Sequence, residues 1–322
     1  MYDVVALGEL LIDFVHKETT KAGYPVMQAN PGGAPGNFLS TASLFGARAA
    51  FIGKVGDDGF GLMLKRTLKE SGIDVRGVIS DPNVFTTLAF VTLDENGDRA
   101  FSFARKPGAD TMLTASELPM DIIENTRFFH FGSLSMTHEP ARAATQEAVA
   151  RAKAAGAIIT FDPNLRQSLW SNLELAKEQM LWGLRHADIV KISREELEFL
   201  FEGDFRAQAD RLVAEYGVKL VFATMGRDGC YFVNRNASGQ VPTFCSVPTI
   251  DTTGAGDIFG GSAVYKVMEL EQLPENLNEY QLRDIVTFAN AAASLSTTRH
   301  GGIPSIPSKL EVEAFVVENA HR

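Results

Sequence analysis

The chain has 322 residues, of which 45% are hydrophobic and 22% are charged, and its formal net charge is −10 at pH 7. That length is enough for one large domain or two small ones with a real core. The acidic balance argues against nucleic acid as a partner, and no apolar run reaches the length of a membrane span. The first residues lack the basic segment of a signal peptide, and the two cysteines show neither metal-ligand spacing nor a disulfide framework. We therefore expect a cytoplasmic protein with no membrane partner.

Short apolar segments alternate with amphipathic ones along the chain, which predicts an α/β fold. Near-continuous apolar strands are typical of a mostly parallel sheet with helices on both faces. Ligands of such sheets bind beyond the carboxyl ends of the strands. We expect a single domain over residues 1–322. The expected strands are 4–8, 50–55, 128–131, 158–162, 189–192, 220–224 and 231–233, and the expected helices include 139–155, 173–185 and 205–216.

Polar residues near the N-terminus indicate a site for a hydroxyl-rich ligand. Asp13 follows the first expected strand, and its carboxylate can accept hydrogen bonds from two neighbouring hydroxyls. Gly32 and Gly33 let the backbone approach a ligand closely. Asn37 opens the next helix with an amide that can donate and accept, and an N-cap role is its alternative.

A hairpin is predicted by residues 86–94 and 99–104, which alternate apolar and polar side chains around Asn96-Gly97. It is either an edge hairpin of the main sheet or part of a separate small sheet that closes over the substrate as a lid. Residues 10–31 and 84–107 are expected to be inserted β segments that form the lid, although residues 10–15 continue into a polar loop. Arg105 is either solvated or reaches the substrate, and Phe103 can supply an apolar wall.

Asp162-Pro163-Asn164-Leu165-Arg166 closes a strand with a rigid turn, because Pro163 fixes the local backbone. We expect Asn164 and Arg166 to point out of this turn. An arginine fork matches phosphate oxygens, so Arg166 can bridge a substrate and a transferring phosphate. A surface ion pair is the alternative role.

The most informative segment is Asp251-Thr252-Thr253-Gly254-Ala255-Gly256-Asp257, a tight glycine turn that enters an apolar helix. Free N–H groups of Gly254, Ala255 and Gly256 at a helix N-terminus suit a phosphate or a developing oxyanion. Asp257 then lies where a carboxylate can take a proton from a hydroxyl. The segment therefore predicts phosphoryl transfer to an alcohol, and a capped helix is the structural alternative.

The residues expected to bind a nucleotide form a less specific sequence pattern. The segment from Thr224 to Gly229 follows a strand and is punctuated by Gly226, although a hairpin turn would look the same. Asn290 lies in an alanine-rich helix that can pack against a flat adenine, and a solvent-facing asparagine is its alternative. The chain has no P-loop motif and no Gly-x-Gly-x-x-Gly after its first strand, which disfavours P-loop enzymes and nicotinamide dehydrogenases.

Two segments resemble the signatures of the ribokinase-like (PfkB) family of sugar kinases. The N-terminal one is Asn30-Pro31-Gly32-Gly33-Ala34-Pro35-Gly36-Asn37, and the C-terminal one is the 251–257 segment. The resemblance covers nearly the whole chain and implies a ribokinase-like fold, ATP and Mg²⁺ as cofactors, and a lid that often forms a dimer contact. It also implies roles for particular residues. Asp257 is the implied base; Asp13, Gly32, Gly33 and Asn37 are the implied sugar contacts; and Thr224, Gly226 and Gly229 are implied to lie along ATP.

The resemblance also implies metal sites. Glu196 matches a family residue that orients water on Mg²⁺, while Ser193 replaces the usual asparagine and reaches less far toward the nucleotide. Ser193 and Glu196 also fit a capping box, which is a structural alternative for both. The family's potassium site corresponds to Asp251, Thr253, Ser296, Arg299, Gly301 and Ser305.

Fructose, phosphorylated on its 6-hydroxyl, is the first expected substrate, because residues 8–15 and 32–37 are similar to fructokinases. The alternatives are 2-keto-3-deoxygluconate, whose carboxylate would need an arginine such as Arg105 or Arg166, and ribose. A catalytically silent sugar-binding regulator would show a damaged Gly-x-Gly-Asp motif, which this chain keeps intact. The expected partners are a sugar, ATP and a second copy of the chain through the lid.

Overall fold

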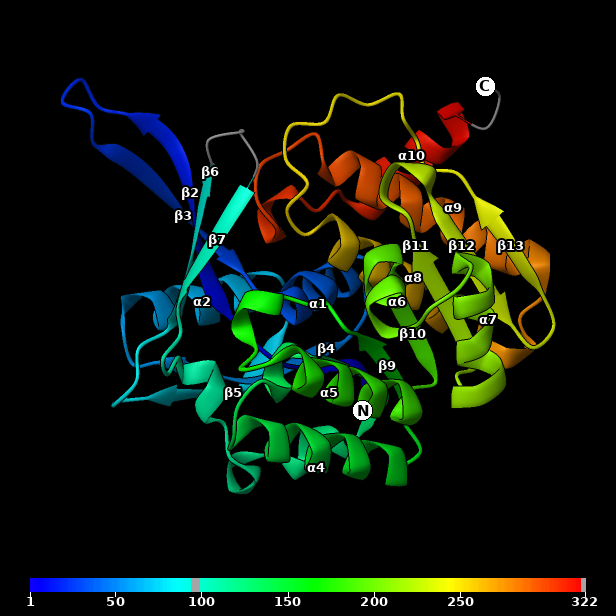
Figure 1. Ribbon diagram of the computed structural model, residues 1–322, viewed down its shortest axis with the longest axis horizontal. Coiled ribbons are helices and arrows are strands. Elements are labelled where there is room, and N and C mark those ends of the chain that lie inside the picture. The colour runs from blue at the N-terminus through cyan, green and yellow to red at the C-terminus, as the bar shows by residue number, and fades with distance from the viewer. Residues whose placement is uncertain (94–98, 320–322) are drawn as a thin grey trace.

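A nine-stranded sheet forms the centre of the computed structural model, which describes residues 1–93 and 99–319. Helices cover both of its faces (Figure 1). The two pairings at one edge are antiparallel, because the second strand from that edge runs opposite to the rest, and all other pairings are parallel. The spatial order is β13 (Ser238–Val241), β12 (Cys230–Asn234), β11 (Leu220–Thr224), β10 (Ile189–Ser193), β9 (Ile158–Asp162), β8 (Thr126–Gly132), β1 (Tyr2–Leu7), β4 (Ala49–Gly56) and β5 (Asp74–Asp81).

Each central strand contributes to two hydrophobic cores. In β1, Val4 and Ala6 enter one core while Val5 and Leu7 enter the other, which explains the near-continuous apolar sequence. The first core is closed by α1 (Ala34–Leu44), α2 (Gly59–Glu70), α8 (Ala255–Glu269), α9 (Glu279–Ser296) and α10 (Lys309–Asn319). The second is closed by α3 (Met120–Ile123), α4 (Ala141–Ala154), α5 (Leu173–His186), α6 (Arg194–Leu200) and α7 (Phe205–Tyr216).

The predicted α/β architecture is confirmed, and β9, β11 and α7 have the predicted bounds. The strands β5 and β13 were not predicted. Within residues 1–93 and 99–319, none of the helices combines the length and apolarity that crossing a membrane requires.

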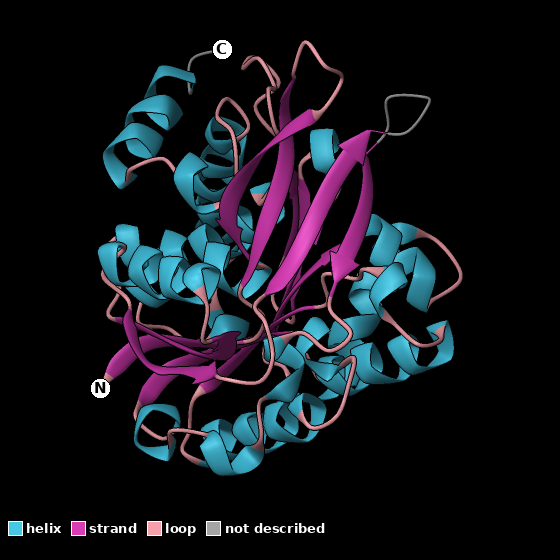
Figure 2. Ribbon diagram, turned by 90° about the vertical axis from the view of Figure 1, so that its left-hand side faces the viewer, coloured by secondary structure: helices cyan, strands magenta, loops and turns pink. Residues whose placement is uncertain are grey.

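A second sheet of four strands stands apart from the main one (Figure 2). Its order is β3 (Pro25–Gly32), β2 (Leu11–Thr19), β6 (Thr87–Leu93) and β7 (Arg99–Ala104). The interpretation as a separate small sheet is therefore confirmed, and the edge-hairpin alternative is wrong. The polar loop expected after residue 15 is also wrong, because β2 continues to Thr19 and pairs with β3. Its outer residues are exposed, so they lack the apolar alternation that signals a strand.

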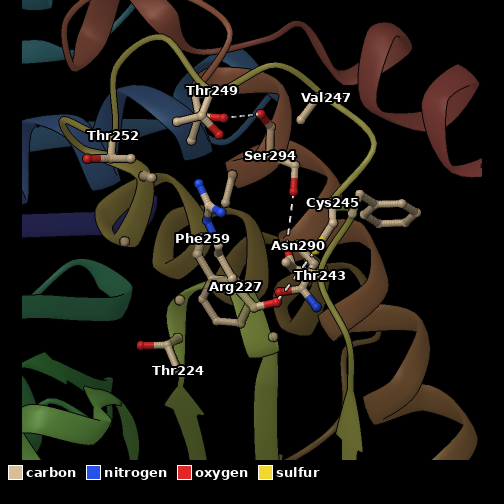
Figure 3. Close-up of a pocket in the computed structure, with 17 residues that line it drawn as sticks. Thr224, Arg227, Thr243, Cys245, Val247, Thr249, Thr252, Phe259, Asn290 and Ser294 are labelled. Carbon is tan, nitrogen blue, oxygen red and sulfur yellow. Dashed lines mark hydrogen bonds between the residues drawn. The ribbon is translucent and has the colours of Figure 1, made fainter.

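The carboxyl ends of the parallel strands open toward α8 and α9. Figure 3 shows Thr224, at the end of β11, in one cavity with Phe259 of α8 and Asn290 of α9. Polar residues from distant parts of the chain therefore meet at this edge, as expected for a parallel sheet.

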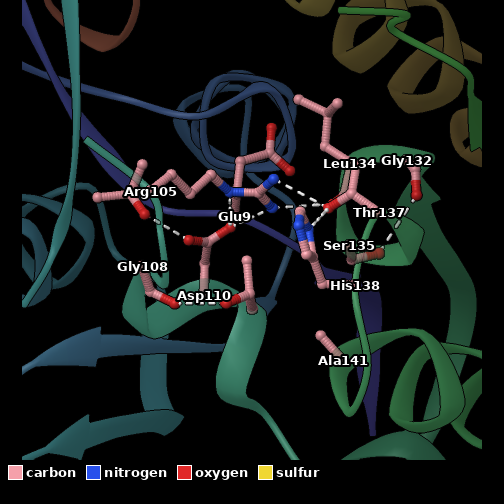
Figure 4. A network of polar contacts seen from close by, with 12 residues as sticks. Glu9, Arg105, Gly108, Asp110, Gly132, Leu134, Ser135, Thr137, His138 and Ala141 are labelled. Atoms are coloured by element: carbon pink, nitrogen blue, oxygen red, sulfur yellow. Dashed lines mark hydrogen bonds and ion pairs between the residues drawn. The ribbon is translucent and has the colours of Figure 1, made fainter. Parts of the chain in front are cut away.

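A buried ion pair anchors the small sheet to the main domain (Figure 4). Arg105, directly after β7, donates from Nε and an Nη to the same Asp110 oxygen at 2.8 and 2.6 Å. Its guanidinium also donates to Thr137 Oγ1 and to the Leu134 carbonyl, both at 2.9 Å. Asp110 in turn accepts a hydrogen bond from Thr87 at the start of β6. Both strands of the β6–β7 pair are thus tied to segments next to the main sheet, at the end where Leu88 pairs with Ala104.

We expect Asp110→Ala to destabilise the protein by about 3–5 kcal/mol, because it leaves the Arg105 guanidinium buried without its counter-charge. Urea unfolding followed by circular dichroism measures the change. Asp121→Ala is the control: Asp121 pairs with Arg76 at 3.4 Å on the surface, and its loss should change stability little. Equal effects of the two substitutions would show that the buried pair is not an anchor.

Candidate active site

The turn before α8 has the conformation that its glycine predicts. Gly254 is the N-cap of α8 with φ 76°, in the left-handed region that favours glycine. The first-turn amides of a helix have no intrahelical acceptor. The Ala255 N–H donates to the Thr252 carbonyl over 3.3 Å, a long hydrogen bond. The amides of this turn, with the partial positive charge of the helix end, form a site that favours an anion.

Asp257 lies in this first turn and is held by a residue from α1. The Asn37 amide Nδ2 donates to Asp257 Oδ2 over 2.8 Å. Gly33, not Asn37, is the N-cap of α1, so the N-cap alternative for Asn37 is wrong. Burial raises the pKa of Asp257, while the Asn37 hydrogen bond and the charges of Lys191 and Arg166 oppose that rise. The result is a fixed carboxyl group whose proton affinity exceeds that of an exposed aspartate.

A cavity of about 420 Å³ opens in front of Asp257, and we call it the Asp13 cavity. It lies between the small sheet, α1 and the first turn of α8. Gly32 lies behind Asp13: a Cβ on Gly32 would be 2.2 Å from Asp13 Oδ2, so a side chain there would displace the carboxylate. The cavity is lined by Glu9, Leu11, Asp13, Gly33, Ala34, Asn37, Phe103, Leu134, Asn164, Arg166, Thr252, Thr253, Gly254 and Asp257.

The carboxyl groups of the Asp13 cavity hold protons unusually tightly. Burial raises the pKa of Asp13 to about 7, although the charge of Arg166 lowers it. Burial also raises the pKa of Glu9 to about 7. Glu9 Oε1 accepts from the Ala34 N–H at 3.0 Å, while Oε2 is buried without a hydrogen-bond partner among the described residues. Sequence reasoning missed Glu9, although a charged residue directly after a buried strand was the available signal.

Two predicted arginines have different positions. Arg166 follows the turn after β9 and lines the Asp13 cavity together with Asn164, whose φ is 43°. Arg105 instead turns its guanidinium into the buried pair with Asp110. The prediction that Arg105 reaches the substrate is therefore wrong, because its hydrogen bonds anchor the small sheet.

A second cavity, of about 490 Å³, lies on the other side of the first turn of α8, and we call it the Asn290 cavity. Thr252 lines both cavities. The Asn290 amide Nδ2 donates to the carbonyls of Val241 and Pro242, so Asn290 holds the wall of the cavity in place. The cavity is lined by Thr224, Gly226, Arg227, Gly229, Thr243, Phe244, Cys245, Val247, Thr249, Thr252, Ala255, Gly256, Phe259, Asn290, Ala293, Ser294 and Thr297.

The predicted capping box at the start of α6 is confirmed. Ser193 Oγ accepts from the Glu196 N–H at 3.2 Å, and Glu196 Oε2 accepts from the Ser193 N–H at 2.8 Å. Glu196 Oε1 accepts from the Leu165 N–H at 2.8 Å. Glu196 therefore also ties α6 to the turn that carries Arg166, a contact that the sequence did not predict.

The loop before α8 packs against the segment after α9. Asp251 Oδ1 accepts from Thr253, and its Oδ2 accepts from the Gly301 N–H at 2.9 Å. The Ser296 and Ser305 hydroxyls donate to the carbonyls of Ala293 and Gly302. The Arg299 side chain turns outward to Glu311, so only its backbone remains near the loop.

The comparisons with known proteins cover nearly the whole chain. A family model described as pfkB family carbohydrate kinase matches residues 1–309. Fructokinase-1 of Zea mays is 43% identical over 318 residues, which are 96% of this chain and 96% of the maize protein.

Two solved structures are similar in fold and sequence. A fructokinase from Xylella fastidiosa with bound ATP has a TM-score of 0.91 at 31% identity, over 99% of this chain and 100% of that one. A double mutant of a fructokinase from Vibrio cholerae O395, in a fructose, ADP and potassium ion bound form, has a TM-score of 0.87 at 30% identity, over 98% of each chain. Because the family model spans nearly all of its residues, this chain belongs to the pfkB family of carbohydrate kinases.

Proposed function

We propose that the chain is an ATP-dependent fructokinase, which transfers the γ-phosphoryl group of ATP to the 6-hydroxyl of fructose. The observation that carries the proposal is the position of Asp257. It lines the Asp13 cavity from the first turn of α8, while Gly256 beside it lines the Asn290 cavity. An acceptor in the first cavity and a nucleotide in the second would meet at one helix N-terminus, which favours anionic groups. The ATP named for the Xylella structure and the fructose and ADP named for the Vibrio structure support a nucleotide and a sugar as the two ligands.

Asp257 is the proposed general base. Its carboxylate accepts the proton of the 6-hydroxyl as that oxygen attacks the γ-phosphorus and ADP leaves in line. Asn37 keeps the carboxylate in one orientation through its 2.8 Å hydrogen bond. We assign the anion hole to the turn of Gly254, Ala255 and Gly256, and a second phosphate contact to Arg166.

A neutral sugar suits the charge of the Asp13 cavity better than a sugar acid. Glu9, Asp13 and Asp257 place three carboxyl groups in its wall. Arg105 is bound to Asp110, so Arg166 is the arginine left in the wall among the described residues. 2-keto-3-deoxygluconate remains the second candidate substrate, because Arg166 could pair with its carboxylate, and ribose is the third. The residues assigned to the sugar are Asp13, Gly32, Gly33, Asn37, Phe103, Asn164 and Arg166.

We propose ATP and Mg²⁺ as cofactors. Among the described residues, no group of three or more acidic, histidine or cysteine side chains could hold a metal ion. We assign the ligands of Mg²⁺ mainly to phosphates and water, which is its usual mode. Glu196 is assigned to that water shell from its fixed position in the capping box. The residues assigned to the nucleotide are Ser193, Thr224, Gly226, Gly229, Gly254, Gly256 and Asn290.

Potassium binding and lid closure complete the proposal. The packed loops around Asp251 suit a monovalent cation held mainly by backbone carbonyls, and potassium in the Vibrio structure supports that assignment. The assigned residues are Asp251, Thr253, Ser296, Arg299, Gly301 and Ser305.

We assign a lid role to segments 10–31 and 84–107, since Leu11, Asp13 and Phe103 of the small sheet line the Asp13 cavity. The open edges at β3 and β7 could pair with a second copy.

We expect Asp257→Asn to lower kcat with fructose by about 10³-fold, because the amide cannot accept the proton. Fructose affinity should change little, since the asparagine keeps the shape of the site. ADP release is measured with Mg-ATP and fructose, 2-keto-3-deoxygluconate, ribose, glucose or adenosine, and fructose binding is measured by calorimetry.

The sugar panel identifies the substrate, and the Asp257→Asn variant tests whether Asp257 is the base. Fructose should have the highest kcat/KM. A higher kcat/KM on the keto-acid would keep the mechanism and replace the substrate. Near-normal turnover by Asp257→Asn would remove Asp257 as the base, and binding of fructose without turnover by the unmodified protein would favour the silent regulator.

We expect fructose affinity of the ATP-free enzyme to fall as the pH is lowered through about 7, where the raised pKa of Asp13 lies. The ionised carboxylate accepts hydroxyl protons on both oxygens, whereas the protonated acid loses part of that capacity. Fructose is therefore expected to bind more tightly at higher pH. Calorimetry at several pH values measures the affinity, with Asp13→Asn as the control, for which weaker binding and a smaller pH dependence are expected, the remainder coming from Glu9, whose pKa is also raised to about 7. Unchanged affinity across this range would argue against Asp13 as the acceptor.

A further inference from the structure

A charged residue interrupts the buried strand β10. Lys191 is flanked by apolar residues, and only 13% of its side chain is exposed. Its Nζ lies 3.1 Å from Oδ2 and 3.2 Å from Oδ1 of Asp162, at the end of β9. An ammonium group is costly to bury, even when it is paired. A residue that only had to fill β10 would be apolar, so the charge needs a separate explanation.

Lys191 lies directly behind the first turn of α8. A Cβ built on Gly256 would be only 3.2 Å from the Lys191 Nζ. The small cavity that Lys191 itself lines has a volume of about 10 Å³, room for one water at most. Little solvent therefore screens the ammonium charge from the groups around it.

The charges of Asp162, Glu196 and Asp257 converge on this lysine. Burial alone would lower the pKa of Lys191, but these carboxylates raise it above its ordinary value, so the side chain stays an ammonium. In return, the charge of Lys191 lowers the pKa of Asp257 against the effect of burial.

We propose that Lys191 is a positioning residue of the phosphoryl-transfer site. Held by Asp162, its ammonium supplies fixed positive charge behind the first turn of α8, beside the Asp257 carboxylate before it takes the proton and near the phosphoryl group whose oxygens carry negative charge during the transfer. This proposal rests on the proposed kinase function. Lys191 keeps its protons throughout the reaction. The hydroxyl proton passes to Asp257, and the phosphoryl group passes from the ADP oxygen to the sugar oxygen.

Arg166 and Lys191 flank Asp257 from different directions. Arg166 lies in the wall of the open Asp13 cavity, while Lys191 lies in the protein interior. A fixed interior charge needs no reorganisation during the reaction, which is the condition for strong electrostatic stabilisation. The polar and charged side chains that face Asp257 from the surrounding elements are Asp13 (β2), Asn37 (α1), Asp162 (β9), Arg166 (after β9), Lys191 (β10) and Glu196 (α6).

Lys191→Met tests the proposal, because it keeps an unbranched side chain only one atom shorter and removes the charge. We expect kcat with fructose and Mg-ATP to fall about 100-fold, while KM for fructose changes less than about threefold. We also expect the acid limb of the kcat–pH profile to move to higher pH, since Asp257 loses a cation that lowers its pKa. Activity is expressed per folded protein, measured by circular dichroism.

A second variant separates electrostatics from folding. Lys191→Met leaves Asp162 buried without its counter-charge, which alone can destabilise the protein. The double variant Lys191→Met with Asp162→Asn removes both charges and keeps an oxygen that can accept from the Asn164 N–H. We expect the double variant to recover stability but not kcat.

Lys54→Met is the matched control. Lys54 is also a buried lysine on a strand, with its Nζ 2.7 Å from Glu117 and 3.3 Å from Asp81. Its loss should lower stability and leave kcat and the pH profile unchanged.

The outcomes are distinct. Low kcat with a shifted pH profile in both Lys191 variants supports the proposal. A double variant that is stable and has normal kcat shows that Lys191 only supports the fold. A loss of kcat in Lys54→Met as large as that in Lys191→Met leads to the same conclusion. Normal wild-type activity combined with normal kcat in both Lys191 variants overturns this inference and leaves the kinase function standing. A wild-type protein that phosphorylates no sugar of the panel overturns both.

Discussion

The close packing of α1 against α8 is the constraint on which the site depends. A Cβ on Gly261 would lie 2.4 Å from the Phe38 carbonyl oxygen, so a glycine at this position lets the two helices approach. That approach brings Asn37 within 2.8 Å of Asp257. The same packing keeps the first turn of α8 between the two cavities. A wider helix spacing would break the hydrogen bond and move the carboxylate away from an acceptor hydroxyl by a distance that matters for catalysis.

The buried carboxyl groups of the site lower the stability of the ligand-free protein and favour the binding of a ligand. Burial raises the pKa of Glu9 and of Asp13 to about 7, and it raises the pKa of Asp257 as well. Carboxyl groups in such positions cost free energy in the absence of a partner. Hydroxyl groups of a sugar are suitable partners, because they donate hydrogen bonds without adding a charge. Strained charge placement of this kind is typical of functional sites rather than of cores.

The fold was largely predictable because both faces of the main sheet are buried. Strands such as β9 and β11 are continuous apolar runs, and the alternation with helices leaves few topologies. Residues 10–31 were predicted as a β lid segment, but the individual strands β2 and β3 were not, because the outer part of this hairpin is exposed and its sequence follows no apolar alternation. In the candidate site, the glycine turn before Asp257 was predictable, since the conformation of Gly254 is a local property of the chain.

The position of Arg105 was predicted wrongly, because it depends on a contact that only the folded chain makes, although its partner Asp110 is five residues away in the sequence. Arg105 and Arg166 each follow a strand, and nothing in their neighbouring residues distinguishes them. Asp110 determines the position of Arg105, because its carboxylate holds the guanidinium in the interior. Asp110 lies in a short helical turn whose sequence has no pattern that would predict it. Lys191 is the converse case: its neighbours predict an ordinary buried strand, and only the folded chain places its charge next to Gly256. A buried charge inside an apolar strand is therefore not a signal by itself, because Lys54 of β4 is also buried and paired, with Asp81 and Glu117. The position beside the first turn of α8 distinguishes Lys191, because a catalytic site at that edge of the sheet can use the charge whose burial is costly.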